Sequence, residues 1–469
     1  MSKAISLLAT VAALAQITHG LSIPHRRDDG GLRVVALDTA RQTPRDPLRR
    51  DRLRKRGTFE VGLDNEETLY FINATIGTPA KSLRLHIDTG SSDLWVNTPG
   101  SRLCRSNTDP CAYAGTYSAN SSSTYEYIAS NFNISYVDGS GASGDYVADT
   151  ITIGSQTLDR LQFGIGYSST NAQGILGIGY TLNEVQVGRA GLRPYPNLPA
   201  QLVTEGLIQS NAYSLWLNDL DANTGNILFG GVDTAKFTPP LMSLPIESAS
   251  GAYAEFMLTL TKLQLAGRTI GGGDIAIAAL LDTGSSLTYL PDALVQEIYS
   301  AVGAVFDSDA NAAYVPCSLA RNTTARLDFT FSEPTISVEM NELVLDLITS
   351  SGRRPTFSNG VPACLFGIGP AGGGMYVLGD TFLRSAYVVY DLDNNKIALA
   401  PTLFNSTASK VVEIGKGENS VPGATRVQNP VKATEGLRGL NASAAGRLLE
   451  GRAWVAGVVA GVVVLLGLV

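Results

Sequence analysis

The pentapeptide Asp-Thr-Gly-Ser-Ser occurs twice in this chain of 469 residues, at positions 88–92 and 282–286. With average residue usage, one such pentapeptide has a chance probability on the order of 10⁻⁶ per position. Each copy follows an apolar run, which is typical of a buried strand that breaks into a tight turn where glycine supplies the backbone freedom. The two copies therefore predict two carboxylates, Asp88 and Asp282, each held at the end of a rigid strand.

A second pattern also repeats, and it indicates an internal duplication. Ile-Leu-Gly at 175–177 begins 87 residues after Asp88, and Val-Leu-Gly at 377–379 begins 95 residues after Asp282. Two similar lobes related by a pseudo-twofold axis would bring the two aspartates face to face. The sequence therefore favours one site built from both halves of the chain.

The histidine count excludes whole classes of hydrolase. Two of the three histidines, His19 and His25, belong to the leader, so that His86 is the one histidine of the remaining chain. A Ser-His-Asp or Cys-His hydrolase would need His86 as its base. We expect His86 to be structural instead, because it lies inside a strand, just before Asp88. Zinc sites built from clusters of His and Cys are excluded as well, which leaves carboxylate chemistry.

Charge is distributed unevenly along the chain. The formal net charge is −7, although residues 21–56 carry eleven Lys and Arg against five Asp and Glu. The body of the protein is therefore acidic. This balance argues against nucleic acid as a partner and suits an enzyme that works in acid.

These motifs resemble those of the pepsin-like aspartic proteases over about residues 69–401, and the chain is most similar to the fungal GPI-anchored, yapsin-like endopeptidases. The resemblance implies an all-β, bilobal fold, in which two pseudo-twofold-related β lobes, 57–240 and 241–405, enclose the active site in the cleft between them. It implies that Asp88 and Asp282 activate a water that hydrolyses peptide bonds, without a cofactor or a metal. Substrates would be peptides or proteins, and we expect a monomer.

The resemblance also assigns roles around the two aspartates. Threonines would lock the two turns together, and serines would hydrogen-bond the outer carboxylate oxygens. The supporting residues are Thr89, Gly90, Ser91, Thr283, Gly284 and Ser285. The stretch 134–141 resembles the mobile flap that closes over substrate, and an ordinary surface hairpin is the alternative. The residues expected at the flap are its tyrosine, Tyr136, the turn residues Asp138 and Gly139 and, packed against it, Trp95.

Asp138 bears on specificity. Placed just beyond the flap tyrosine, its carboxylate would hang over the pocket for the side chain before the scissile bond. It would favour Lys or Arg in that pocket, and yapsin-like relatives do prefer basic residues. The alternative is that Asp138 only caps the Asp-Gly turn, which its residue type suits equally.

The four cysteines are expected to pair, because a chain with a signal peptide folds in an oxidising compartment. Three connectivities are possible. The pairs nearest in sequence, Cys104–Cys111 and Cys317–Cys364, each stay within one lobe and match bridges that recur in the family. Sequons predict N-glycosylation of the body at Asn73, Asn120, Asn133, Asn322 and Asn405.

The leader, residues 1–56, is predicted to be removed by processing. Residues 1–20 have a lysine followed by a short apolar run, which is the layout of a signal peptide. Residues 21–56 form a basic pro-segment that ends in Lys55-Arg56, a substrate for a secretory-pathway convertase that would cut after Arg56. A solvated basic linker is the alternative, and upstream pairs of arginines are competing processing sites.

The end of the sequence predicts a lipid anchor. Residues 406–452 lose their hydrophobic period and are rich in Ser, Gly and Ala, which is typical of a flexible stalk. Residues 453–469 are uncharged, and they are not followed by the basic residues that a spanning helix carries on its cytoplasmic side. They complete the layout of a GPI-anchor signal, with Asn441 as the attachment residue and Ser443 as the second choice. We therefore expect the mature protein on the extracellular face of the plasma membrane or in the cell wall.

Two other classes of function stay open. A catalytically silent, surface-anchored binding protein could use the same fold, although both aspartates and both Thr-Gly pairs are intact. A retaining glycosidase also uses two carboxylates about 5 Å apart. It gives no reason, however, for matched turns in two halves of one chain.

Overall fold

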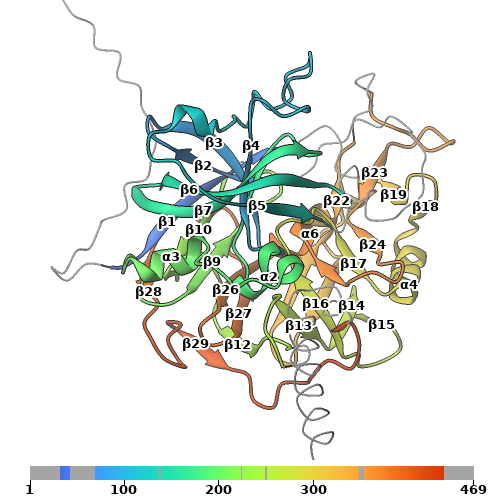
Figure 1. The fold of residues 1–469 in the computed structure, drawn as a ribbon. Helices are drawn as coiled ribbons and strands as arrows, with labels where there is room; N and C mark the ends of the chain where they lie inside the picture. Colours follow the sequence, from blue (N-terminus) through green and yellow to red (C-terminus); the bar gives the residue numbers. More distant parts are fainter. Residues whose placement is uncertain are drawn as a thin grey trace, which may run out of the picture.

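Two β-rich halves make up the described part of the chain, and they are coloured blue to green and yellow to orange in Figure 1. The residues that this computed structural model describes are 32–42, 69–136, 139–222, 224–248, 251–347 and 353–437. The all-β, bilobal fold predicted from the sequence is confirmed.

One large sheet joins the two halves. Its strands are β1 (Val35–Gln42), β2 (Leu69–Ile76), β3 (Lys81–Asp88), β4 (Leu94–Asn97), β5 (Glu126–Ser135), β6 (Gly141–Ile153), β7 (Gln156–Ser169), β8 (Gly174–Gly177), β9 (Ala212–Trp216), β10 (Thr224–Phe229), β12 (Leu241–Pro245), β26 (Ala386–Asp391), β27 (Lys396–Pro401) and β29 (Ala424–Arg426). They lie in the spatial order β29-β12-β27-β26-β9-β10-β1-β2-β3-β8-β4-β7-β6-β5. Strands from both ends of the described chain thus share one backbone hydrogen-bond network.

Three smaller sheets build the second half, with the orders β13-β16-β25-β17-β24, β15-β14-β20-β21 and β18-β19-β23-β22. Their strands are β13 (Met257–Leu260), β14 (Lys262–Leu265), β15 (Arg268–Ile270), β16 (Ile277–Leu281), β17 (Thr288–Leu290), β18 (Val305–Asp307), β19 (Ala312–Pro316), β20 (Arg326–Thr330), β21 (Thr335–Glu339), β22 (Val344–Leu345), β23 (Ala363–Phe366), β24 (Ile368–Pro370) and β25 (Val377–Leu378). A separate pair joins β11 (Gly231–Asp233) to β28 (Val411–Glu413).

Helices are short and lie between the strands. The α-helices described are α2 (Val185–Ala190), α3 (Leu198–Thr204), α4 (Asp292–Val302), α5 (Met340–Leu343) and α6 (Asp380–Leu383), and the 3₁₀ turns are η1 (Ala119–Ser121), η2 (Thr181–Asn183) and η3 (Cys317–Arg321). None of the helices in the described ranges is long and apolar enough to cross a bilayer.

Residue patterns explain how the strands pack. β21 alternates exposed and buried positions, because one of its faces packs on the core and the other meets solvent. β16, which leads into Asp282, reads Ile-Ala-Ala-Leu-Leu and is buried at every position. A continuous apolar run of this kind is typical of a strand that is covered on both faces. The strand that carries Asp282 is therefore held from both sides.

A strand from the predicted pro-segment lies inside the large sheet. β1 pairs with β10 from Val35, opposite Phe229, to Ala40, opposite Thr224, and its end also pairs with β2. Val35 and Leu37 are buried. Sequence reasoning did not find this strand, because basic residues dominate the composition of 21–56.

The prediction of a flexible stalk is wrong for residues 406–437, which we call the strap. β28 of the strap adds antiparallel to β11, and β29 adds parallel to β12. Ile414 and Val427 are only 0% and 1% exposed. Figure 1 shows the strap, in red, running along the lower edge of the molecule from one half to the other.

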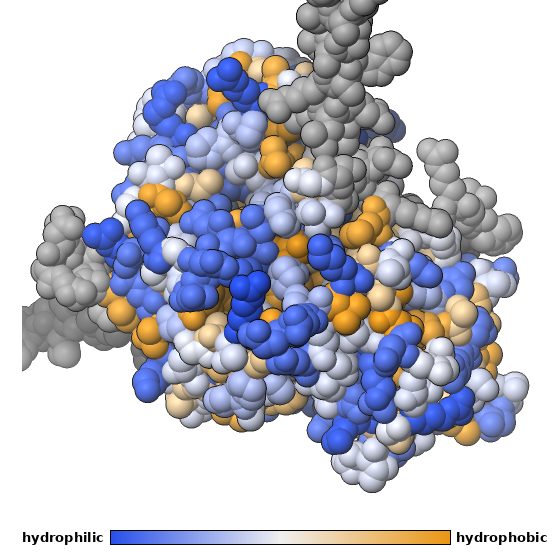
Figure 2. Space-filling view, turned by 90° about the horizontal axis from the view of Figure 1, so that it is seen from below, coloured by the Kyte–Doolittle hydropathy of each residue, from blue (hydrophilic) through white to orange (hydrophobic). Residues whose placement is uncertain are grey.

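The strap is ordered because it covers sheet edges. An edge strand offers unpaired N–H and C=O groups, and a short stretch of the strap can pair with them without a long hydrophobic pattern. Further along, Ala278 N donates to Glu435 O at 2.8 Å, so the strap also reaches β16. The face of the molecule seen from below is mainly hydrophilic, with apolar side chains in small groups (Figure 2).

Candidate active site

The first Asp-Thr-Gly turn holds Asp88 by both carboxylate oxygens. Asp88 is the last residue of β3, whose partner β8 runs parallel to it. Gly90 N donates to Asp88 Oδ1 at 2.9 Å, and Ser91 Oγ donates to Asp88 Oδ2 at 2.6 Å. The side chain is 2% exposed. The turn therefore fixes the orientation of the carboxylate before any substrate binds.

The second turn repeats this arrangement around Asp282. It follows β16, which has β25 as its parallel partner. Gly284 N donates to Asp282 Oδ1 at 2.7 Å, and Ser285 Oγ donates to Asp282 Oδ2 at 2.7 Å. Asp282 is 5% exposed. Two parts of the chain that are far apart in sequence thus build the same local structure.

The two turns are bound to each other through their threonines. Thr89 N donates to Thr283 Oγ1 at 3.1 Å, and Thr283 N donates to Thr89 Oγ1 at 3.0 Å. Each hydroxyl then donates onward across the interface, Thr89 Oγ1 to Leu281 O and Thr283 Oγ1 to Ile87 O, both at 2.9 Å. All of these groups are satisfied in the interior, which is what a rigid buried polar network requires.

Glycine is required in both turns because the opposite carboxylate comes so close. A Cβ added to Gly90 would lie 2.6 Å from Asp282 Oδ1. A Cβ added to Gly284 would lie 2.4 Å from Asp88 Oδ1 and 2.8 Å from Asp282 Oδ1. The two Oδ1 atoms are therefore the inner oxygens of a convergent pair, and the two serines hold the outer ones.

Comparison with known proteins identifies this arrangement. A family model described as "Eukaryotic aspartyl protease" matches residues 69–402, the part of the chain that holds both turns. The chain belongs to this family. It is an aspartic-type endopeptidase, as the relatives that resemble it are named.

Three fungal proteins are among those that the chain resembles. The chain is 55% identical over 433 residues to "Probable aspartic-type endopeptidase opsB" of Aspergillus oryzae, covering 91% of this chain and 87% of that protein. It is 51% identical over 438 residues to the Aspergillus fumigatus protein of the same name, covering 92% and 88%. It is 38% identical over 371 residues to "Secreted aspartic protease 3" of Candida albicans, covering 77% and 86%.

A solved structure supports the fold of this aspartyl protease independently. The crystal structure of an aspartic proteinase from Irpex lacteus matches with a TM-score of 0.58 at 23% sequence identity. The match covers 80% of this chain and 100% of that one. At this identity the likeness speaks for the fold alone.

The hairpin of β5 and β6 is bound to β4, the strand that follows the first turn of the protease. Tyr136 N donates to Ser140 O at 2.8 Å, and Gly139, with φ 79°, closes the turn. Trp95, which is 0% exposed, donates from Nε1 to Tyr136 Oη at 2.7 Å. Tyr136 is therefore tied to the body just beyond the Asp88 turn. Asp138 lies outside the described residues.

A buried acidic network behind the first turn was missed by the sequence analysis. Asp93 Oδ1 accepts from Tyr146 Oη at 2.6 Å and from Tyr195 Oη at 3.0 Å, and Oδ2 accepts from Val185 N at 2.8 Å. Burial raises the pKa of Asp93. Glu184 is fully buried beside it, and burial raises the pKa of Glu184 to about 10. The available signal was a charged residue directly after the first repeated pentapeptide.

A third carboxyl, Glu255, lies near Asp282 and was also missed. Burial and the charge of Asp282 raise the pKa of Glu255 to about 7. No motif surrounds Glu255 in the sequence. Its position follows only from the pairing of β13 with β16.

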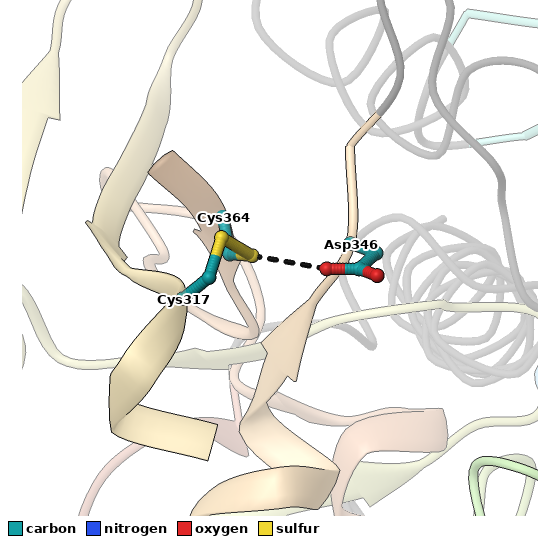
Figure 3. Close-up of side chains that lie close together, drawn as sticks. All are labelled: Cys317, Asp346 and Cys364. Atoms are coloured by element: carbon teal, nitrogen blue, oxygen red, sulfur yellow. Dashed lines mark hydrogen bonds between the residues drawn. A yellow bond between two sulfur atoms is a disulfide. The ribbon is translucent and has the colours of Figure 1, made fainter. Parts of the chain in front are cut away.

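Both predicted disulfides, Cys104–Cys111 and Cys317–Cys364, are confirmed. The second lies beside Asp346, whose Oδ1 is 3.2 Å from Cys364 Sγ (Figure 3). These three residues have the spacing of a metal site. Because the two sulfurs are bonded to each other and carry no hydrogen, they are neither thiolate ligands nor donors, and the approach of the carboxylate is a van der Waals contact.

The remaining predicted positions fall into two groups. The five asparagines of the body sequons are all exposed, so glycans could attach there, and occupancy stays a prediction; they are Asn73, Asn120, Asn133, Asn322 and Asn405. The signal peptide, the processing site at Arg56, the anchor sites Asn441 and Ser443 and the apolar tail lie outside the described residues. His86 is buried in β3, with its ring 5.8 Å from that of Phe71.

Proposed function

We propose that Asp88 and Asp282 are the catalytic pair of this endopeptidase. The observation that carries the proposal is the convergence of their inner oxygens beside Gly284, while serines and glycine amides hold each carboxylate in place. A water between the two Oδ1 atoms would contact both carboxylates. No other described pair of carboxylates has this twofold arrangement.

Peptide hydrolysis then follows from sharing one proton. Two carboxylates at this separation do not both ionise in acid, as is general for aspartic protease dyads. The ionised aspartate takes a proton from the water, which attacks the scissile carbonyl carbon. The protonated aspartate hydrogen-bonds the carbonyl oxygen, and a proton then passes to the leaving amine as the C–N bond breaks. The proton count belongs to the pair, since the two titrations are coupled.

The surroundings serve this step in two ways. The crossed threonine bonds keep the two halves of the site at a fixed separation, which matters because catalysis depends on near-attack geometry. Tyr136, which accepts a hydrogen bond from Trp95, would close over the bound peptide and exclude water. Asp138 on the same hairpin would favour Lys or Arg before the scissile bond.

We further propose that the enzyme is made as a secreted zymogen and anchored at the cell surface by GPI. The supports are the apolar leader, the dibasic Lys55-Arg56, the two disulfides and the apolar tail with its small residues at Asn441. A relative named as a secreted protease, that of Candida albicans, agrees with the secretory route. Release of the full-length protein from membranes by phosphatidylinositol-specific phospholipase C tests the anchor.

Pepstatin-sensitive proteolysis tests the proposed chemistry against its alternatives. The purified protein should cleave a denatured protein substrate at about pH 4, and pepstatin should abolish the cleavage. A silent binding protein would cleave nothing. A glycosidase would hydrolyse oligosaccharides and ignore pepstatin.

A further inference from the structure

The ladder between β13 and β16 continues up to the catalytic turn. Met257 lies opposite Leu280 in this antiparallel pair. At the next position, Leu281 N donates to Phe256 O at 3.1 Å, so these two residues are also opposite each other. The backbone of β13 is therefore still in register with β16 where β16 ends at the catalytic aspartate.

Glu255 and Asp282 are the residues that follow this hydrogen bond, just beyond the paired ends of β13 and β16. If the antiparallel register continues by one residue, the two side chains point to the same face of the sheet. The charge of Asp282 acts on Glu255, which agrees with this placement. Glu255 therefore lies close to the catalytic carboxylate, and the proposed mechanism gives it no role.

Glu255 is neither paired nor sealed off. The residue is half-buried, so part of it reaches solvent. Among the described residues none donates a hydrogen bond to it, and the ionisable group that acts on it is Asp282. A ring contact joins Tyr180 to Phe256, and phenols bring no charge in acid. A partly desolvated carboxylate without a cation favours a cationic ligand, because charge-assisted hydrogen bonds are strong.

The equivalent position in the first lobe carries no charge. β2 pairs with β3 in the same way, with Phe71 opposite His86, and the register leads to Leu69 opposite Asp88. At these two matched positions of the described chain, an acidic residue thus lies near Asp282 and an apolar residue near Asp88. Any effect on substrate choice should be confined to one side of the scissile bond.

We propose that Glu255 is a specificity-determining residue that recognises a Lys or Arg side chain of the peptide in the subsite next to Asp282. This rests on the proposed function, in which the scissile bond lies over Asp88 and Asp282. The selection depends on pH, since the pKa of about 7 leaves Glu255 mostly neutral near pH 4.5 and increasingly ionised toward pH 6.5. A bound cation promotes that ionisation further.

The test compares Glu255→Gln with the wild type and with Glu339→Gln, an exposed carboxyl at the end of β21. Each purified enzyme is assayed on peptides with a single Lys or norleucine at each position that flanks the scissile bond, at about pH 4.5 and pH 6.5. At one of these peptide positions, the wild type and Glu339→Gln should cleave the Lys peptide roughly tenfold better than the norleucine peptide at about pH 6.5. The preference should be smaller at about pH 4.5. Glu255→Gln should lose this preference at both.

The results separate this inference from the proposed function. An unchanged ratio of Lys to norleucine cleavage in Glu255→Gln at every position overturns the role of Glu255. So does a pH profile that shifts equally for both peptides, because Glu255 would then tune the catalytic pair and not select substrate. If the wild type cleaves no peptide in acid, the proposed function itself fails.

Discussion

In the first lobe the residue after Asp-Thr-Gly-Ser-Ser is Asp93, and in the second it is Leu287. Asp93 is buried with Glu184 in a network of tyrosines, whereas Leu287 is buried in an apolar cluster with Tyr289. Near the catalytic aspartates, on the neighbouring segment of chain, the residue types are reversed. Leu69 in the first lobe is apolar, and Glu255 in the second lobe is acidic. The hydrogen bonds of the two turns are nevertheless the same.

This difference separates two demands on the fold. Catalysis by a shared water needs two matched carboxylates, so the turns are alike down to each donor. The layers behind and beside the turns are free to differ. The first lobe places a buried acid, Asp93, directly after its pentapeptide, and the second has an acid, Glu255, for which we propose a contact with substrate.

The largest expected effect comes from breaking the match between the turns. Asp88→Asn and Asp282→Asn should each lower kcat by roughly 10²–10⁴, because either change removes half of the acid–base pair. Both variants should still fold, since the amide oxygen can accept from the glycine N–H while the amide NH2 donates to the serine hydroxyl. Purified proteins free of host proteases are assayed at about pH 4, with the exposed Asp159→Asn as control. If either variant retains more than about 1% activity, the two aspartates do not contribute equally to catalysis.

The strap offers the second test, since it pairs with strands of both lobes. Truncation after Asn405 removes buried Ile414 and Val427, each contributing roughly 1.5–3 kcal/mol. It should lower the free energy of unfolding by several kcal/mol and reduce secretion. Truncation after Leu437 keeps the strap and should release a stable, active enzyme into the medium. Equal stability of the two truncated proteins in urea would show that the strap is dispensable.

The buried acids of the first lobe should lower the free energy of unfolding as the pH rises from acid to neutral. Glu184 keeps its proton in the folded state up to about pH 10 and loses it in the unfolded chain above its ordinary pKa of 4.5. Its contribution is therefore complete below about pH 4.5 and is lost as the pH rises toward 10. Between about pH 5 and pH 7.5, Glu184→Gln should spare up to about 3 kcal/mol of that loss. Unfolding curves at both pH values measure this loss in the wild type, in Glu184→Gln and in the control Glu205→Gln, which changes an exposed residue. An equal loss of stability in all three proteins would refute the role of Glu184.

The smallest expected effect concerns the flap of the first lobe. Asp138→Ala should cut the preference for Lys or Arg over Leu or Phe before the scissile bond by roughly ten- to a hundredfold, since hydrogen bonds to charged groups contribute about 1.5–3 kcal/mol. Peptide-library profiles of the two enzymes at one acid pH measure it. An unchanged profile leaves Asp138 as a turn residue. If Asp138→Ala instead loses the preference for Lys at the peptide position that depends on Glu255, then Asp138 and Glu255 belong to one subsite.

Sequence patterns predicted the features that occur in both halves of the chain and missed those that occur in one half alone. Asp88 and Asp282 stand in duplicated motifs, so the fold and both disulfides could be anticipated from them and from the family resemblance. Glu255 stands in no motif, because its place depends on the register between two strands that are not neighbours in the sequence. The strap was mistaken for a stalk because its short strands gain order from the sheet edges they cover and not from their own hydrophobic period.

Binding of pepstatin tests the central claim, that the two turns form one site, most directly. Calorimetric titration at about pH 4 should give one inhibitor bound per chain in the wild type. Asp88→Asn and Asp282→Asn should each weaken that binding strongly and to a similar extent. Two inhibitors per chain, or full affinity retained in one of the two variants, would contradict a site shared between the lobes.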